Sequence, residues 1–192
     1  MPSDDELTNR DLAEVGEVAF RCRNLKAAVR KALEKTEGVV TREDLASMEK
    51  LSAESEGITD LTGLEHAINL KNVWLGYNLV RDIQPLAGLT QLANLYLREN
   101  QIGELSPLTN LSNLAALDLS ENQVDDLTPL SGLRSLKRLY LNQNRIDELA
   151  PLANLENLLE LGLAENQITD IGPLANLTQL KWGLSLDRNK IT

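Results

Sequence analysis

The chain has 192 residues, of which 42% are hydrophobic and only 3% aromatic, and it carries a net charge of -10 at pH 7. Its acidity argues against binding to nucleic acid or insertion at anionic membrane surfaces, because both attract basic patches. No apolar run has the roughly 20 residues that a membrane span needs, and the single Cys22 excludes an intrachain disulfide.

Residues 1–19 form a polar, acidic lead-in with no clear period. The first residues, MPSDDELTNRD, lack the basic and apolar regions of a signal peptide. We therefore expect a cytoplasmic location if Met1 is the native start, and leave the compartment open if a leader has been removed.

Residues 20–51 are predicted to form a helical N-terminal cap. Helical spacing of apolar residues begins after Asn24, which we expect to be the N-cap, and Gly38 lies past the end. A second helix is expected at Thr41, where Asp44 follows three residues later as in a capping box. Two short helices ahead of a repeat array would cover the apolar face of its first repeat.

Residues 48–192 consist of about seven repeats. The pattern L-x-x-L-x-L-x-x-N occupies 70–78, 92–100, 114–122, 136–144 and 158–166, a period of 22 residues typical of a solenoid. An early unit at 48–56 has Glu56 in place of Asn, and the unit at 180–189 has one extra residue at Trp182 or Gly183, interpreted as a bulge. The asparagine column comprises Asn78, Asn100, Asn122, Asn144, Asn166 and Asn189.

Each position of the repeat has a structural interpretation. The alternating L-x-L segment predicts a short strand with leucines inward, so stacked repeats should form one parallel sheet roughly 30 Å long. An Asn side chain can donate twice and accept, and so can bond its own turn and the next coil. This column is therefore a structural ladder that satisfies buried backbone groups.

A carboxylate precedes a proline in most repeats. The acids are Asp60, Asp82, Glu104, Asp126, Glu148 and Asp170, and the prolines are Pro85, Pro107, Pro129, Pro151 and Pro173. This order predicts carboxylate capping of short 3₁₀ turns on the convex side. One carboxylate per repeat is too sparse for a metal array, so we expect no metal and no cofactor.

These columns resemble the 22-residue repeats of bacterial leucine-rich-repeat proteins of the internalin type, and VVTREDLASMEKL (39–51) resembles their helical cap. The resemblance implies an α/β solenoid: a right-handed horseshoe with a concave parallel sheet that binds other proteins, commonly at the cell surface or after secretion. The last unit stops at Thr192 in mid-repeat, so we expect the native protein to continue.

Five of the six aromatic residues map to outward strand positions or the turn that follows, and exposed Trp, Tyr and Arg are typical of protein interfaces. Cross-strand packing would also favour aromatic residues there and is the alternative interpretation. The candidate partner-binding residues are Trp74, Tyr77, Tyr96, Arg98, Asp118, Arg138, Tyr140, Asn142 and Trp182.

The leading hypothesis is therefore a protein-recognition module that binds a partner through its concave face. The alternative is an intracellular scaffold that positions a neighbouring domain absent from this chain, and carbohydrate binding by the aromatic strip is a lesser option. The only histidine, His66, lies outside the strands, and no catalytic motif is present. We expect no enzymatic activity.

Overall fold

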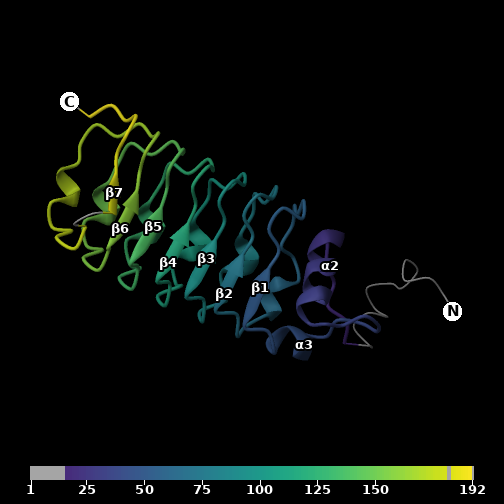
Figure 1. Cartoon of the computed structure of the whole chain (residues 1–192). Coiled ribbons are helices and arrows are strands. Elements are labelled where there is room, and N and C mark those ends of the chain that lie inside the picture. Colours follow the sequence, from purple (N-terminus) through teal and green to yellow (C-terminus); the bar gives the residue numbers. More distant parts are fainter. Residues whose placement is uncertain (1–15, 181–182, 192) are drawn as a thin grey trace.

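The computed structural model describes residues 16–180 and 183–191. In this part of the chain two α-helices precede a stack of coils, each made of one strand, a turn and a return segment (Figure 1). The helices are α2 (Arg23–Ala32) and α3 (Arg42–Ala46). The strands β1 to β7 are Lys50–Ser52, Asn72–Trp74, Asn94–Tyr96, Ala116–Asp118, Arg138–Tyr140, Glu160–Gly162 and Gly183–Ser185.

Helix α2 begins earlier than predicted. Cys22 is the N-cap, so the prediction of Asn24 as N-cap is wrong. Asn24 lies in the first turn, where its side-chain Nδ2 donates instead to the carbonyl oxygens of Glu56 at 2.7 Å and Gly57 at 3.2 Å. A single Asn therefore ties the cap to the first repeat.

The C-terminus of α2 is closed by a glutamate in the left-handed conformation. Glu34 has a φ of 53°, and its N–H and that of Lys35 donate to the carbonyls of Lys31 and Arg30. This is a Schellman arrangement, a position that glycine usually fills. Gly38, expected past the helix end, has a positive φ in a separate later turn.

Helix α3 has the capping box that the sequence predicts. The N–H of Asp44 donates to the Thr41 hydroxyl, and the N–H of Thr41 donates to the Asp44 carboxylate. Lys35 also contacts this carboxylate, at 2.5 Å, and is the main cause of the lowered pKa of Asp44. At the end of the predicted lead-in, Val18 is buried and its N–H donates to Val40.

The strands form a single parallel sheet in chain order, β1 to β7, with each strand from β1 to β5 paired to the same position 22 residues on. The central residue of each strand from β1 to β6 points inward and is buried. At β7, Gly183 pairs with Glu160. The pairing is therefore offset by 23 residues here, so the extra residue of this unit lies before Gly183; Trp182 itself lies outside the described residues.

The Asn ladder links each coil to the one before it. Asn122 Nδ2 donates to Leu119 in its own coil at 3.1 Å and to Leu97 in the preceding coil at 2.9 Å. Its Oδ1 accepts from the N–H of Ile102, also in the preceding coil, at 3.0 Å. Every member of the column makes the equivalent contacts. The structural role is as predicted, but the bridged coil is the preceding one rather than the next.

The residue before the Asn position is left-handed in every repeat, with φ between 53° and 59°. This left-handed column comprises Ser55, Tyr77, Glu99, Glu121, Gln143, Glu165 and Arg188. None is glycine, although a side chain in this region costs roughly 1–2 kcal/mol. The turn is therefore imposed by the neighbouring hydrogen bonds rather than by local preference.

The return segments contain the predicted 3₁₀ helices, which face away from the sheet. They are Leu64–His66, Gln84–Leu86, Ser106–Leu108, Thr128–Leu130, Ala150–Leu152 and Gly172–Leu174. Five members of the acidic column accept from the N–H two residues on, at 2.7–2.8 Å. Glu148 makes no such bond in the described part of the chain. Within residues 16–180 and 183–191, no helix has the length and apolarity to cross a membrane.

We predict that Asn122→Ala lowers the free energy of unfolding by about 1–3 kcal/mol, because it leaves the buried groups of two coils without partners. Thermal and urea unfolding followed by circular dichroism measure the change. Asn110→Ala, which removes an exposed asparagine, is the matched control. Equal stability of the two variants would contradict a structural role for the ladder.

The left-handed column predicts a specific substitution pattern at the exposed Gln143. Gln143→Val should destabilise the protein by about 1–2 kcal/mol relative to Gln143→Gly, because β-branched residues are least tolerated at positive φ. Urea unfolding midpoints test this. Gln91→Val, outside the left-handed region, should be close to neutral. If Gln143→Val and Gln143→Gly unfold at the same urea concentration, the assignment is refuted.

Candidate functional site

Three columns of residues cover the outward side of the sheet, and together we call them the strand face. The first column comprises Lys50, Asn72, Asn94, Ala116, Arg138, Glu160 and Gly183. The middle column comprises Ser52, Trp74, Tyr96, Asp118, Tyr140, Gly162 and Ser185. The last column, after the second core leucine, comprises Glu54, Gly76, Arg98, Ser120, Asn142, Ala164 and Asp187.

Trp74 and Tyr96 form a stacked pair across β2 and β3. Their ring centroids lie 5.9 Å apart and the ring planes differ by 9°. Both side chains are half-buried. Aromatic pairs of this kind stabilise a sheet and hold the two rings in a fixed orientation. One face of the Tyr96 ring is thus occupied by Trp74, and the other is on the side of β4.

Asp118 is the next residue of the middle column, paired in register with Tyr96 on one side and Tyr140 on the other. Its Oδ1 accepts from the N–H of Ser120 at 2.9 Å, which fixes the carboxylate on the sheet. The side chain is half-buried, and it takes part in no salt bridge within the described ranges 16–180 and 183–191.

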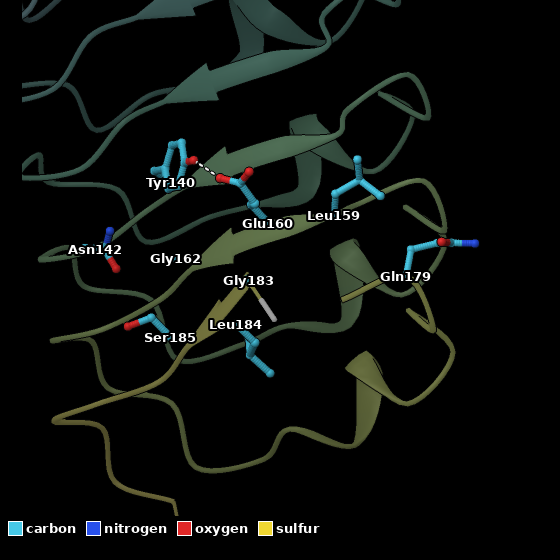
Figure 2. Close-up of a pocket in the computed structure, with 9 residues that line it drawn as sticks. All are labelled: Tyr140, Asn142, Leu159, Glu160, Gly162, Gln179, Gly183, Leu184 and Ser185. Atoms are coloured by element: carbon cyan, nitrogen blue, oxygen red, sulfur yellow. Dashed lines mark hydrogen bonds between the residues drawn. The ribbon is translucent and has the colours of Figure 1, made fainter. Parts of the chain in front are cut away.

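Tyr140 is held by a neighbouring glutamate. Its hydroxyl donates to the Glu160 carboxylate on β6, as the dashed line in Figure 2 shows. Partial burial, followed by the hydrogen bond to Glu160 and its negative charge, raises the pKa of Tyr140 to about 12. The phenol is therefore neutral at physiological pH.

The two candidate arginines differ in their surroundings. Arg98 Nε donates to the Glu121 carboxylate at 3.0 Å, and the contact with Glu121 is the main cause of the raised pKa of Arg98. Arg138 is exposed and forms no salt bridge to a residue that the structure describes. Of these two arginines, Arg138 is therefore the one whose charge is available to a partner.

A hollow of about 690 Å³ lies over β5, β6 and β7 at one end of the strand face (Figure 2). Gly162 and Gly183 are among the residues that line it. A Cβ on Gly162 would lie 2.6 Å from Asn142 Nδ2, so any larger residue would displace the Asn142 side chain. The hollow is lined by Tyr140, Asn142, Leu159, Glu160, Gly162, Gln179, Gly183, Leu184 and Ser185.

The strand face brings together most of the predicted binding residues, namely Trp74, Tyr96, Arg98, Asp118, Arg138, Tyr140 and Asn142. Asn142 is partly committed to the fold, because its Oδ1 accepts from Ala164 at 3.0 Å. Tyr77 lies in the left-handed column at the edge and is 46% exposed. Trp182 lies outside the described residues.

Sequence reasoning missed the contributions of Glu160 and the two glycines. The alternation of the repeat assigns Glu160 to the strand face but does not link it to Tyr140, since the two belong to different columns. Gly162 did carry a signal, because it stands where four other repeats have Trp, Tyr or Asp. In the described part of the chain, no three His, Cys, Asp or Glu side chains gather as metal ligands would.

A parallel sheet of one strand per 22-residue coil, with an Asn ladder and 3₁₀ return segments, defines a leucine-rich-repeat solenoid. The family model described as "Leucine Rich repeats (2 copies)" matches four overlapping spans, 68–110, 90–132, 112–154 and 134–176. The chain belongs to the leucine-rich-repeat proteins and, within them, to the internalin type of bacterial protein.

Solved structures support this assignment. The chain is similar to internalin C2 of Listeria monocytogenes, with a TM-score of 0.70 and 34% identity over 90% of this chain and 87% of that one. It is also similar to an internalin, InlF, of the same organism, with a TM-score of 0.72 and 34% identity over 90% of this chain and 58% of that one.

A leucine-rich-repeat protein of Leptospira interrogans is more distant, with a TM-score of 0.56 and 27% identity over 70% of this chain and 41% of that one. No curated protein sequence matches the chain. Solenoids of this fold commonly serve as protein-interaction modules.

The environment of Tyr140 predicts a pH dependence. Because its folded pKa of about 12 lies above the unfolded value of roughly 10, the stability that it contributes is complete below pH 10 and is lost between pH 10 and about 12. In Glu160→Gln the Tyr140 pKa should fall but stay above 10, because the contribution of burial remains, and NMR titration of ¹³C-labelled tyrosine can measure the change. An unchanged Tyr140 pKa would contradict the Glu160 contact.

Proposed function

We propose that the protein binds another protein through the strand face. The observation that carries this proposal is the row Trp74, Tyr96, Asp118 and Tyr140, which runs along consecutive positions of β2 to β5. Trp and Tyr are among the residue types that contribute most to protein interfaces, and these stand on a rigid sheet rather than on loops.

The fold does not need these side chains for its core. The inward residues of β2 to β5 are Val73, Leu95, Leu117 and Leu139, and each is fully buried. The outward rings are only half-buried, although stacking and the Glu160 hydrogen bond restrict them. Restricting side chains before a partner arrives reduces the entropy lost on binding. Cross-strand packing therefore prepares the surface as well as stabilising the sheet.

The size of the surface also suits this role. Seven strands spaced about 4.8 Å apart give a sheet roughly 30 Å long. A standard interface covers about 800 Å² of each partner, and a sheet of this length with its side-chain relief is of that order. Such a partner would cover the aromatic row at the centre and reach charged residues on both sides.

The experiment is a pull-down that compares wild-type protein with Trp74→Ala/Tyr96→Ala/Tyr140→Ala, read by quantitative mass spectrometry. We expect the triple variant to lose at least 90% of the capture of the true partner, roughly the effect of removing 1.4 kcal/mol or more of binding free energy. Circular dichroism establishes that the variant remains folded.

Ile68→Ala/Ile171→Ala is the matched control, because it removes two exposed apolar side chains, 53% and 40% exposed, that lie outside the strands. This variant should retain the partner. If the folded triple variant captures every protein that the wild type captures, the strand face is not the binding surface.

A further inference from the structure

We propose that the Asp118 carboxylate, which lies between Tyr96 and Tyr140 in the middle column of the strand face, receives a lysine or arginine side chain of the partner protein. We call the position formed by these three residues the Asp118 recess. The proposal rests on the function proposed above and names the chemistry that the strand face recognises. Three observations support it: the order of Tyr96, Asp118 and Tyr140 in one row, the contacts that restrain the two tyrosine rings, and the negative charge around them.

The register places the three residues at adjacent strand positions, with Asp118 directly between the tyrosines. The backbone positions of Tyr96 on β3 and Tyr140 on β5 are therefore about 9.6 Å apart, twice the strand spacing. An aliphatic stem in van der Waals contact with a ring on each side needs roughly 7–8 Å between the two ring planes, so one stem fits at this spacing. A basic side chain entering the recess would lie with its stem between the rings and its charge at the carboxylate.

Contacts on their outer sides restrain both rings. Trp74 stacks on Tyr96 from the β2 side, with centroids 5.9 Å apart. Glu160 accepts the Tyr140 hydroxyl from the β6 side. The Tyr96 ring face opposite Trp74 is on the side of Asp118, and the electron-rich face of an aromatic ring attracts ammonium and guanidinium groups.

The Asp118 carboxylate has capacity for a cation. Its Oδ1 accepts one backbone N–H, from Ser120, and no lysine or arginine in the described ranges forms a salt bridge with it. A carboxylate with about four lone-pair sites and one bond can accept further donors. A half-buried carboxylate also interacts more strongly with a charge than an exposed one does.

The residues around Asp118 also carry a net negative charge. The strand face and the left-handed column together carry more acids than bases. The acids are Glu54, Glu99, Asp118, Glu121, Glu160, Glu165 and Asp187. The bases are Lys50, Arg98, Arg138 and Arg188. Arg98 and Arg188 are already paired with Glu121 and Glu165, so the unpaired charge is predominantly negative and favours a basic partner.

Arg138 opposes this preference and makes the proposal testable in both directions. It precedes Tyr140 by two residues on the same strand and is exposed. A basic ligand should bind more tightly when Arg138 is neutral, whereas an acidic ligand would bind less tightly. Asp118→Asn should have the opposite effects, and Asn retains an oxygen to accept the Ser120 N–H, so the fold is preserved.

The test uses capped pentapeptides with two glycines on each side of a central Lys, Arg, Glu or norleucine, titrated into the ¹⁵N-labelled chain. Norleucine has the shape of lysine without its charge. We expect Lys and Arg peptides to shift the backbone amides of β3 to β5, and Glu and norleucine peptides to leave them unchanged. Asp118→Asn should weaken the Lys peptide about tenfold, the effect of one charge-assisted contact. Arg138→Gln should strengthen it.

Three results would overturn the proposal: equal shifts from norleucine and lysine, stronger binding of the Glu peptide, or Lys-peptide binding that Asp118→Asn does not weaken. A different result distinguishes the failure of this proposal from the failure of the proposed function. If the aromatic triple variant loses a partner that Asp118→Asn retains at wild-type affinity, the strand face binds protein but the Asp118 recess does not select a basic side chain.

Discussion

The structure depends on one repeated interaction, in which an asparagine side chain bonds the backbone of its own coil and of the coil before it. Asn144 illustrates the arrangement: Nδ2 donates to Leu141 and Leu119, and Oδ1 accepts from the N–H of Val124. The Val124 and Leu119 groups find these partners only when the next coil is in place. Each coil is therefore completed by its successor, which is why the repeats are stable only as a stack.

This constraint separates the residues that build the fold from those that are free for recognition. Leucines fill the interior, asparagines hold the turns, and carboxylates cap the 3₁₀ segments on the far side. The outward strand positions are left with few structural duties. Side chains there, such as Tyr140 and Asp118, can therefore vary in type while the coil beneath them keeps the same backbone as its neighbours.

The sequence alone predicts the features that repeat. The strands, the ladder, the 3₁₀ segments and the Thr41 capping box follow from patterns in which several columns agree in phase. Features that occur once were harder to predict. Asn is a residue type that favours N-caps, but Asn24 donates to Glu56 and Gly57, 32 and 33 residues away, and no local pattern encodes that contact. The unit at 180–189 has one extra residue, and the sequence did not decide whether this residue is Trp182 or Gly183, because either assignment fits the repeat.

The sequence predicts which residues belong to the candidate site but not how their side chains contact one another. Alternation assigns Trp74, Tyr96, Asp118 and Tyr140 to one face. It does not reveal that Trp74 stacks on Tyr96, that Arg98 is neutralised by Glu121, or that Glu160 holds Tyr140, because these contacts depend on rotamers and on diagonal neighbours. The sequence did not predict the left-handed column for a related reason: its residues are not of the types that favour positive φ, and the ladder imposes the turn.

Native-state hydrogen exchange of the Val124 amide tests the central role of the ladder most directly. Its N–H donates to a side-chain acceptor, Asn144 Oδ1, at the junction of two coils. We predict that it exchanges as slowly as the strand amides of Leu117 and Leu139, through the same cooperative opening. Exchange at the rate of an exposed turn amide would show that the ladder does not couple the coils.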